Sequence, residues 1–100
     1  MNMQMQAMMK QAQQLQNKML QTKKEIDETE FTGESSLVKV TVLGTKEVTK
    51  VEINSEESLG KDDLEMLQDM IMVAVNEANK KVDAEVESKM SQYGNIPGLF

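Results

Sequence analysis

Apolar residues recur at every third or fourth position through the first quarter of the chain. Between residues 5 and 26 the intervals alternate between three and four, with no glycine or proline among them. This is the heptad spacing of a helix that buries one narrow stripe, so we expect a helix over residues 1–28. At about 40 Å it would be longer than a compact domain of this size, and part of it should overhang. The stripe, called the methionine seam below, consists of Met5, Met8, Ala12, Leu15, Met19, Thr22 and Ile26.

The spacing of apolar residues changes to a period of two after residue 36. Val38, Val40 and Val42 alternate with polar residues, and Val51 and Ile53 do the same after a turn near Leu43-Gly44. Such alternation predicts the two strands of a β-hairpin with one buried face.

The residues before the hairpin allow one more short strand. Phe31-Thr32 can form this leading strand, which places all strands within residues 29–54. The next residues, Thr32-Gly33-Glu34-Ser35, lack the additional glycines and the lysine of a phosphate-binding loop. We interpret them as a turn.

Residues 62–91 are predicted to form a second long helix. Asp62 as N-cap, with Glu65 three residues later, is typical of a helix start. The apolar residues that follow include a subset repeating every eleven positions, as in a nearly straight helix. Residues 66–75 are apolar almost all round and should lie on the sheet, whereas the later half should project antiparallel to the first helix. Residues 92–100 should form a flexible tail.

These elements define an α+β fold in a single domain, residues 1–100. A long N-terminal helix precedes a small antiparallel sheet of about three strands, and a long C-terminal helix follows it. So small a sheet is marginally stable alone, and its open edge invites pairing with a second copy. We therefore expect a homodimer. The expected interface residues are Val38, Val40, Val42, Val51, Ile53, Leu67 and Ile71.

The composition excludes most catalytic chemistry. The 100 residues contain no cysteine and no histidine, so there is no thiol nucleophile, no imidazole base and almost no way to build a zinc site. The serines have no base to activate them. We expect a protein that is not an enzyme, with no cofactor, no metal site and no small-molecule substrate. The ten methionines are interpreted as packing residues in preference to a client-binding surface or a soft-metal site.

The location of the protein is suggested by two features of the sequence. No apolar run approaches the length of a membrane span, and the N-terminus lacks the charged start and apolar centre of a signal peptide. We expect a cytoplasmic protein with no membrane partner.

Charge is distributed unevenly along this acidic chain. Seventeen acids against eleven lysines, with no arginine, give a net charge of −6. Residues 1–24 nevertheless hold four lysines and no acid, whereas residues 25–34 hold five acids and no lysine. Charge alone favours a solvated helix face over a binding surface. Antiparallel helices would also bring Lys80, Lys81 and Lys89 to this basic end.

Four blocks of residues, in order over nearly the whole chain, carry a resemblance to a known family. They are residues 8–16, residues 32–35 leading into 37–42, residues 65–71 with 74–78, and residues 96–100. At this spacing they resemble the YbaB/EbfC family of bacterial nucleoid-associated proteins. The resemblance implies a homodimer joined through its sheet, with helices projecting like tweezers. It also implies binding of duplex DNA and an influence on chromosome organisation or gene expression, in the nucleoid.

The resemblance and the basic first quarter together point to DNA contacts through lysine. Since arginine, which can recognise phosphates and bases bidentately, is absent, we expect contacts chiefly to phosphates and weak sequence discrimination. The expected DNA-binding residues are Lys10, Lys18, Lys23, Lys24, Lys80, Lys81 and Lys89.

Two functions of other classes fit the same pattern of elements. A prefoldin-like holdase would also combine two helical arms, a hairpin and methionine-rich tips. A protein-interaction module associated with DNA-repair machinery would instead use the acidic segments, residues 25–34 and 55–69, as its working surface.

Overall fold

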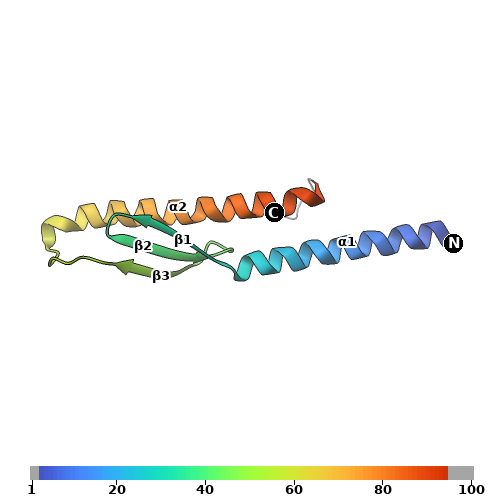
Figure 1. Ribbon diagram of the computed structural model, residues 1–100, viewed down its shortest axis with the longest axis horizontal. Helices are drawn as coiled ribbons and strands as arrows, with labels where there is room; N and C mark the ends of the chain where they lie inside the picture. Colours follow the sequence, from blue (N-terminus) through green and yellow to red (C-terminus); the bar gives the residue numbers. More distant parts are fainter. Residues whose placement is uncertain (1–2, 95–100) are drawn as a thin grey trace.

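A long helix precedes and another follows a three-stranded sheet in the computed structural model, which describes residues 3–94 (Figure 1). The predicted α+β order is confirmed. In the predicted tail, Gln92 and Tyr93 form part of a short 3-10 helix instead, and residues 95–100 lie outside the described residues. The elements are α1 (Met3–Glu28), β1 (Glu30–Ser35), β2 (Val38–Leu43), β3 (Val48–Ile53), η1 (Lys61–Asp63), α2 (Leu64–Met90) and η2 (Ser91–Tyr93).

The sheet is antiparallel, with the strands in the order β1-β2-β3. β1 is a full six-residue strand in which Gly33 pairs with Val40, so the prediction of a turn at residues 32–35 is wrong. The turn lies at Ser36, which has a φ of 50°. Gly33 is needed for another reason: a Cβ atom there would collide with the carbonyl oxygen of Ala74 and lie 2.6 Å from the amide nitrogen of Ala78. Glycine therefore allows the close approach of α2 to β1.

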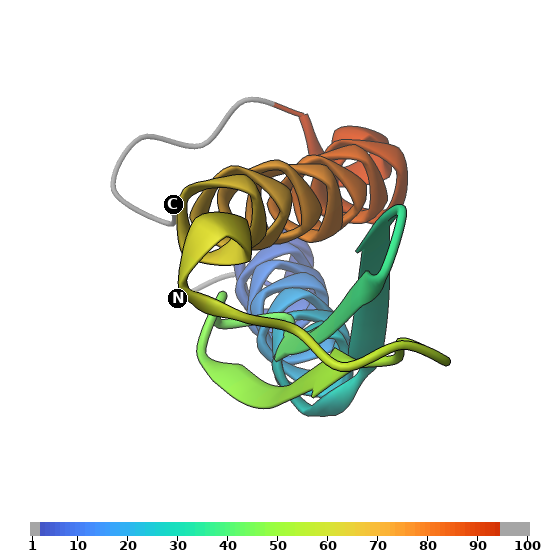
Figure 2. The ribbon, with the colours of Figure 1, turned by 90° about the vertical axis from the view of Figure 1, so that its left-hand side faces the viewer.

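α2 crosses one face of the sheet and packs against β1 and β2 (Figures 1 and 2). This contact extends into the second half of the helix, as far as Val82. The first half of α2 lies on the sheet as predicted, whereas the part that extends past the sheet beside α1 is shorter than expected, since the core reaches Val82 (Figure 1). Met66, Met72 and Val73, in the first half, are 40–57% exposed. The buried residues of this core are Val38, Val40, Val42, Leu67, Ala74, Ala78 and Val82.

The core occupies four of the residues that were expected at a dimer interface. The valines Val38, Val40 and Val42 are at most 1% exposed within one chain, and Leu67 is 9% exposed. Within one chain, α2 covers these side chains. Their place at an interface between two copies stays a prediction.

Within residues 3–94, α1 packs against the other elements through its C-terminal part. Met19 and Ile26 of the methionine seam are buried against Met90 at the end of α2, and the hydroxyl groups of Thr22 and Tyr93 are hydrogen-bonded at 3.1 Å. The helices run in opposite directions, as predicted (Figure 1). The β2–β3 turn also packs against the C-terminal end of α1, and this turn too requires a glycine.

At that turn, the backbone of Gly44 touches the end of α1. A Cβ atom at Gly44 would collide with the carbonyl group of Ile26 and lie 2.9 Å from the amide nitrogen of Asp27. The turn thus holds the junction between α1 and β1 in place. The molecule measures 74 × 18 × 16 Å and has a radius of gyration of 20.2 Å, against about 13 Å for a compact domain of this length. The predicted overhang of α1 is confirmed.

Candidate nucleic-acid interface

The N-terminal part of α1 is an exposed helix without acidic side chains. Every side chain of residues 3–18, called the arm below, is exposed. The arm consists mostly of good helix formers, namely Met, Gln, Ala, Leu and Lys. Its lysines are Lys10 and Lys18, and the exposed Lys24 follows on the same helix. At 100° per residue these three side chains leave α1 within an arc of about 120° and along about 21 Å of its length.

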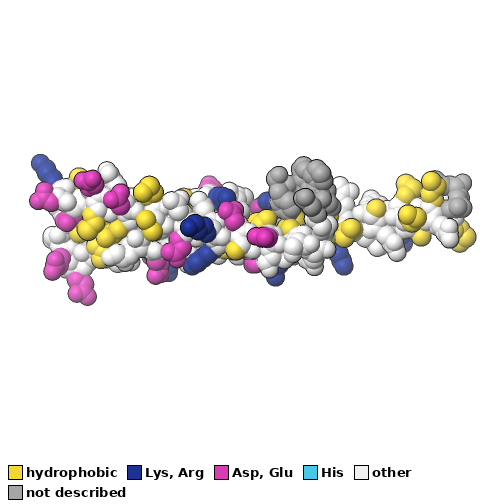
Figure 3. All heavy atoms as spheres, turned by 90° about the horizontal axis from the view of Figure 1, so that it is seen from above, with side chains coloured by type: hydrophobic (Ala, Val, Ile, Leu, Met, Phe, Trp, Pro, Cys, Tyr) yellow, Lys and Arg dark blue, Asp and Glu magenta, His cyan; other side chains and the backbone are white. Residues whose placement is uncertain are grey.

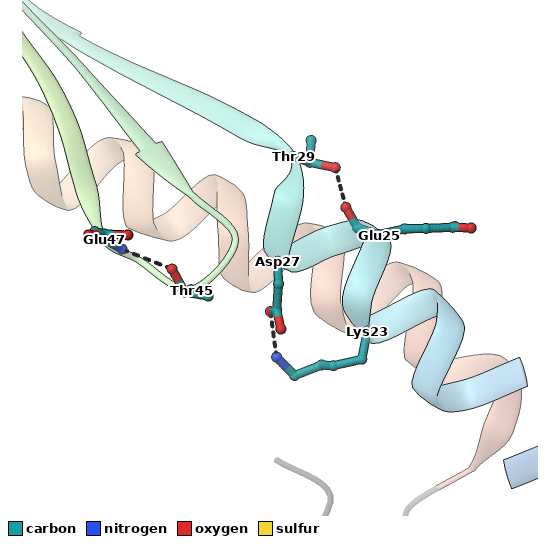
Figure 4. A network of polar contacts seen from close by, with 6 residues as sticks. All are labelled: Lys23, Glu25, Asp27, Thr29, Thr45 and Glu47. Atoms are coloured by element: carbon teal, nitrogen blue, oxygen red, sulfur yellow. Dashed lines mark hydrogen bonds and ion pairs between the residues drawn. The ribbon is translucent and has the colours of Figure 1, made fainter. Parts of the chain in front are cut away.

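Lys23 is engaged within the protein. Its Nζ lies 2.7 Å from Oδ1 of Asp27, one turn later, and both side chains are about one-third exposed. Figure 4 shows this pair in the last turns of α1. It also shows the hydroxyl of Thr29, which donates a hydrogen bond of 2.6 Å to the carbonyl oxygen of Glu25. Because Asp27 neutralises it, Lys23 offers less free charge to an anion than its neighbours do.

The three lysines of α2 do not form one surface. Lys80 and Lys89 are nine residues apart and therefore leave the helix on opposite sides. Lys81 lies 3.8 Å from a carboxylate oxygen of Glu77. All three are exposed. The structure thus brings Lys10, Lys18 and Lys24 together on α1 but does not combine all seven expected lysines in a single face.

Acidic side chains gather at the opposite end of the molecule. In Figure 3 they surround the start of α2, at the left, whereas the arm, at the right, shows lysine and hydrophobic side chains. The acids of this end include Glu56, Glu57, Asp62, Glu65 and Asp69, all exposed. The long axis of the molecule therefore separates an acidic end from a basic arm.

Comparison with known proteins decides what kind of molecule this is. Residues 1–95 match the model of the YbaB/EbfC DNA-binding family. The chain belongs to this family. It is 41% identical to a nucleoid-associated protein of Ligilactobacillus salivarius, with 97% of this chain and 95% of that protein covered. It is 43% identical to a nucleoid-associated protein of Agathobacter rectalis, with 93% and 85% covered. The resemblance seen in the sequence is confirmed.

Within residues 3–94, the arm and its continuation to Lys24 form a lysine-bearing surface of this member of the YbaB/EbfC DNA-binding family. Six glutamines accompany the lysines in residues 3–18, and their amide groups can donate hydrogen bonds to phosphate oxygens. In the described part, residues 3–94, no acidic side chain pairs with Lys10, Lys18 or Lys24. These three lysines are therefore exposed and free of a carboxylate partner within the described residues.

A second exposed surface of this YbaB/EbfC protein is apolar and lies on β3. Val48, Val51 and Ile53 are paired with the valines of β2 and share their face of the sheet. They are nevertheless 43–45% exposed, because α2 lies over β1 and β2 while β3 is the strand farthest from it (Figure 2). The sequence had indicated Val51 and Ile53 but not Val48, which lies next to a β-bulge that interrupts the alternation.

Within residues 3–94, no group of three or more Asp, Glu, His or Cys side chains is arranged to hold a metal ion. None of the helices described is long and apolar enough to cross a membrane.

Proposed function

We propose that this YbaB/EbfC family protein binds duplex DNA as a homodimer, mainly through contacts between lysines and phosphates. The observation that carries the proposal is the arm. In a protein of net charge −6, the exposed side chains of residues 3–24 include lysine and glutamine and not a single acid. We expect the main phosphate contacts to come from Lys10, Lys18 and Lys24. Lys80 and Lys89 contribute from α2, and Lys23 and Lys81 contribute less because each has a carboxylate partner.

The proposed mode of binding follows from the chemistry of these side chains. A lysine ammonium is a compact charge that attracts phosphates without the planar, bidentate geometry of arginine. Contacts to phosphates position a protein on DNA but do not read its sequence. Affinity should therefore depend on salt, and preference among DNA sequences should be weak.

The homodimer is proposed from the uncovered part of the sheet. One helix covers two of the three strands and leaves the apolar row of Val48, Val51 and Ile53 in contact with solvent. Burial of such a row against the same row, or against α2, of a second copy would remove apolar surface from water in both protomers. Ile71, which is half-buried beside the core, is the part of α2 that we add to this interface. Two protomers would present two arms to one duplex.

The cellular role that we propose is organisation of the nucleoid and regulation of gene expression, with the protein located in the nucleoid of the cytoplasm. The names of both relatives, nucleoid-associated proteins, support this role. We propose no small-molecule substrate, cofactor or enzymatic activity.

The deciding experiment is a salt titration of duplex binding, using two unrelated sequences of the same length. If each dimer engages about four to six phosphates, log affinity should fall against log salt with a slope of roughly −4 to −5. The two sequences should give similar affinities. Affinity that does not change with salt would refute the proposal. Suppression of the aggregation of an unfolded client, without any binding of duplex, would favour the holdase.

A further inference from the structure

One row of side chains on α1 faces away from the part of the helix that is buried. Lys10, Asn17 and Lys24 follow one another at intervals of seven residues, and all three are exposed. Seven residues turn a helix by about 20° less than two full turns, so these side chains leave α1 within an arc of about 40°, on the side opposite to the buried Met19 and Ile26. The row thus places one amide midway between two ammonium groups, with about 10 Å of helix on either side.

The described part of the protein gives the side chain of Asn17 no partner. Within residues 3–94 this side chain makes no hydrogen bond, and it is exposed to solvent. All the other residues of the arm are methionine, glutamine, alanine, leucine or lysine, which are strong helix formers, whereas asparagine is a weak one. An alanine at position 17 would therefore stabilise the arm better. The asparagine is better explained by a contact with another molecule than by the stability of the helix.

The amide of asparagine complements one base of duplex DNA. In the major groove, adenine presents N7 as an acceptor and its N6 amino group as a donor. An asparagine amide donates to N7 and accepts from N6 at the same time, which makes a bidentate contact. Its short side chain reaches a base edge only when the helix itself lies in the groove. The major groove is about 12 Å wide and admits an α-helix, whereas the minor groove, about 6 Å wide, does not.

The lysines at the two ends of the row fit the same placement. The Cα atoms of Lys10 and Lys24 are about 21 Å apart along α1. A helix that crosses the groove with Asn17 at its centre therefore carries both ammonium groups past the edges of the groove, where the phosphates lie. Beyond Lys24 the basic row ends, because the exposed Glu28 follows one turn later on nearly the same side and would repel phosphates.

We propose that Asn17 reads an adenine in the major groove while Lys10 and Lys24 contact the phosphates on either side. The inference rests on the proposed function, because it adds a base contact to the same DNA-binding surface. Gln21, one turn after Asn17, is less suited to this contact, since its amide already donates a hydrogen bond of 3.2 Å to Glu25. Because nearly every natural DNA sequence offers an adenine, one such contact is compatible with a weak preference among sequences.

The test measures duplex binding with and without the acceptor atom of adenine. In a duplex of mixed sequence, 7-deazaadenine in place of every adenine replaces N7 with a C–H group but leaves base pairing and the minor groove unchanged. The native full-length protein should bind this duplex at least about threefold more weakly than the ordinary duplex. The variant Asn17→Ala should bind the two duplexes equally. Its slope of log affinity against log salt should equal that of the native protein, since no phosphate contact is lost.

The matched control variant is Gln11→Ala. It removes an exposed amide that leaves α1 about 120° away from Asn17, so it should respond to 7-deazaadenine as the native protein does. A duplex with 7-deazaguanine should bind the native protein as well as the ordinary duplex does. Equal affinity of the native protein for the adenine and 7-deazaadenine duplexes, the same loss in Asn17→Ala, or an equal loss with 7-deazaguanine would overturn the inference and leave the proposed function intact. A native protein that binds no duplex would overturn both.

Discussion

Gly33 of β1 lies directly against the backbone of Ala74 in α2. A Cβ atom at position 33 would collide with the Ala74 carbonyl oxygen and would also crowd the amide nitrogen of Ala78. Both neighbours are main-chain atoms of a helix, which cannot rotate away as a side chain can. Because glycine has only a hydrogen atom in place of a side chain, α2 can lie this close to β1.

The substitution Gly33→Ala should destabilise the protein by about 1–3 kcal/mol, as expected for overpacking of a tight contact. Chemical denaturation followed by circular dichroism measures this change. Gly60→Ala is the matched control, because a Cβ atom at Gly60 has nothing within 4 Å, and its effect should stay within about 0.5 kcal/mol. Equal stability of both variants would show that α2 can move away from β1 at little cost.

The role of Gly33 illustrates what the sequence could predict and what it could not. The alternation of Val38, Val40 and Val42 is a local pattern, and it correctly predicted a strand with one buried face. Thr32-Gly33-Glu34-Ser35 lacks the other residues of a phosphate-binding loop, so its local pattern favours a turn, which the structure contradicts. Glycine is required at position 33 because the backbone of Ala74 lies against it. Ala74 is 41 positions later in the chain, so no local pattern indicates that contact.

The hydrogen bond between Thr22 and Tyr93 should couple α1 to the end of α2. Tyr93→Phe removes one hydroxyl and Thr22→Val the other, and each should cost about 0.5–1.5 kcal/mol. Since both changes remove the same bond, their effects should not add, and the double variant should cost little more than one of them. A double-mutant cycle in urea measures this coupling. Additive losses would mean that the two hydroxyls act independently.

Replacement of the three free lysines should weaken DNA binding. The variant Lys10→Gln, Lys18→Gln and Lys24→Gln keeps the length of the side chains nearly unchanged but removes three charges per protomer. Affinity should fall, and the slope of log affinity against log salt should become shallower by about 0.9 for each lost phosphate contact. Fluorescence anisotropy at several salt concentrations measures both quantities.

The control for this variant is Lys23→Gln, because Asp27 already neutralises Lys23 at 2.7 Å. It should change the affinity less than any of the three single substitutions. If Lys23→Gln weakens binding as much as Lys10→Gln, the arm is not the preferred phosphate-binding surface. Unaltered binding by the triple variant would place the DNA contact elsewhere on the molecule.

A lysine introduced in the apolar row of β3 should disrupt the homodimer. Val51→Lys would place a charge in the apolar row that we propose as the interface, and burial of such a charge is costly. Thr49→Lys is the control on the same strand, since Thr49 is exposed and its hydroxyl bonds to the carbonyl oxygen of Thr41. Sedimentation velocity should show a monomer for Val51→Lys and a dimer for Thr49→Lys. A native protein that is monomeric at micromolar concentration would refute the dimer itself.

Whether a lysine of the candidate site has a carboxylate partner can be predicted from the sequence better on α1 than on α2. Residues 3–24 contain no acid, so the sequence alone excludes a carboxylate partner for Lys10 and Lys18 on the neighbouring turns of their own helix. On α2 lysines and acids alternate, and only the structure shows that Lys81 pairs with Glu77 and that Asp83 pairs with Lys46 of the β2–β3 turn. The second of these ion pairs joins residues that are 37 positions apart.

The arm continues a part of α1 that packs against the rest of the protein. Sixteen residues would hardly maintain a helix in water by themselves, because the first helical turn is costly to form. Residues 19–28 are fixed by Met90, Tyr93 and the backbone of Gly44, and they supply that first turn. Each further residue toward Met3 only extends an existing helix. On heating, the arm should therefore melt gradually from its tip, and helical circular dichroism should decline before the cooperative unfolding of the core begins.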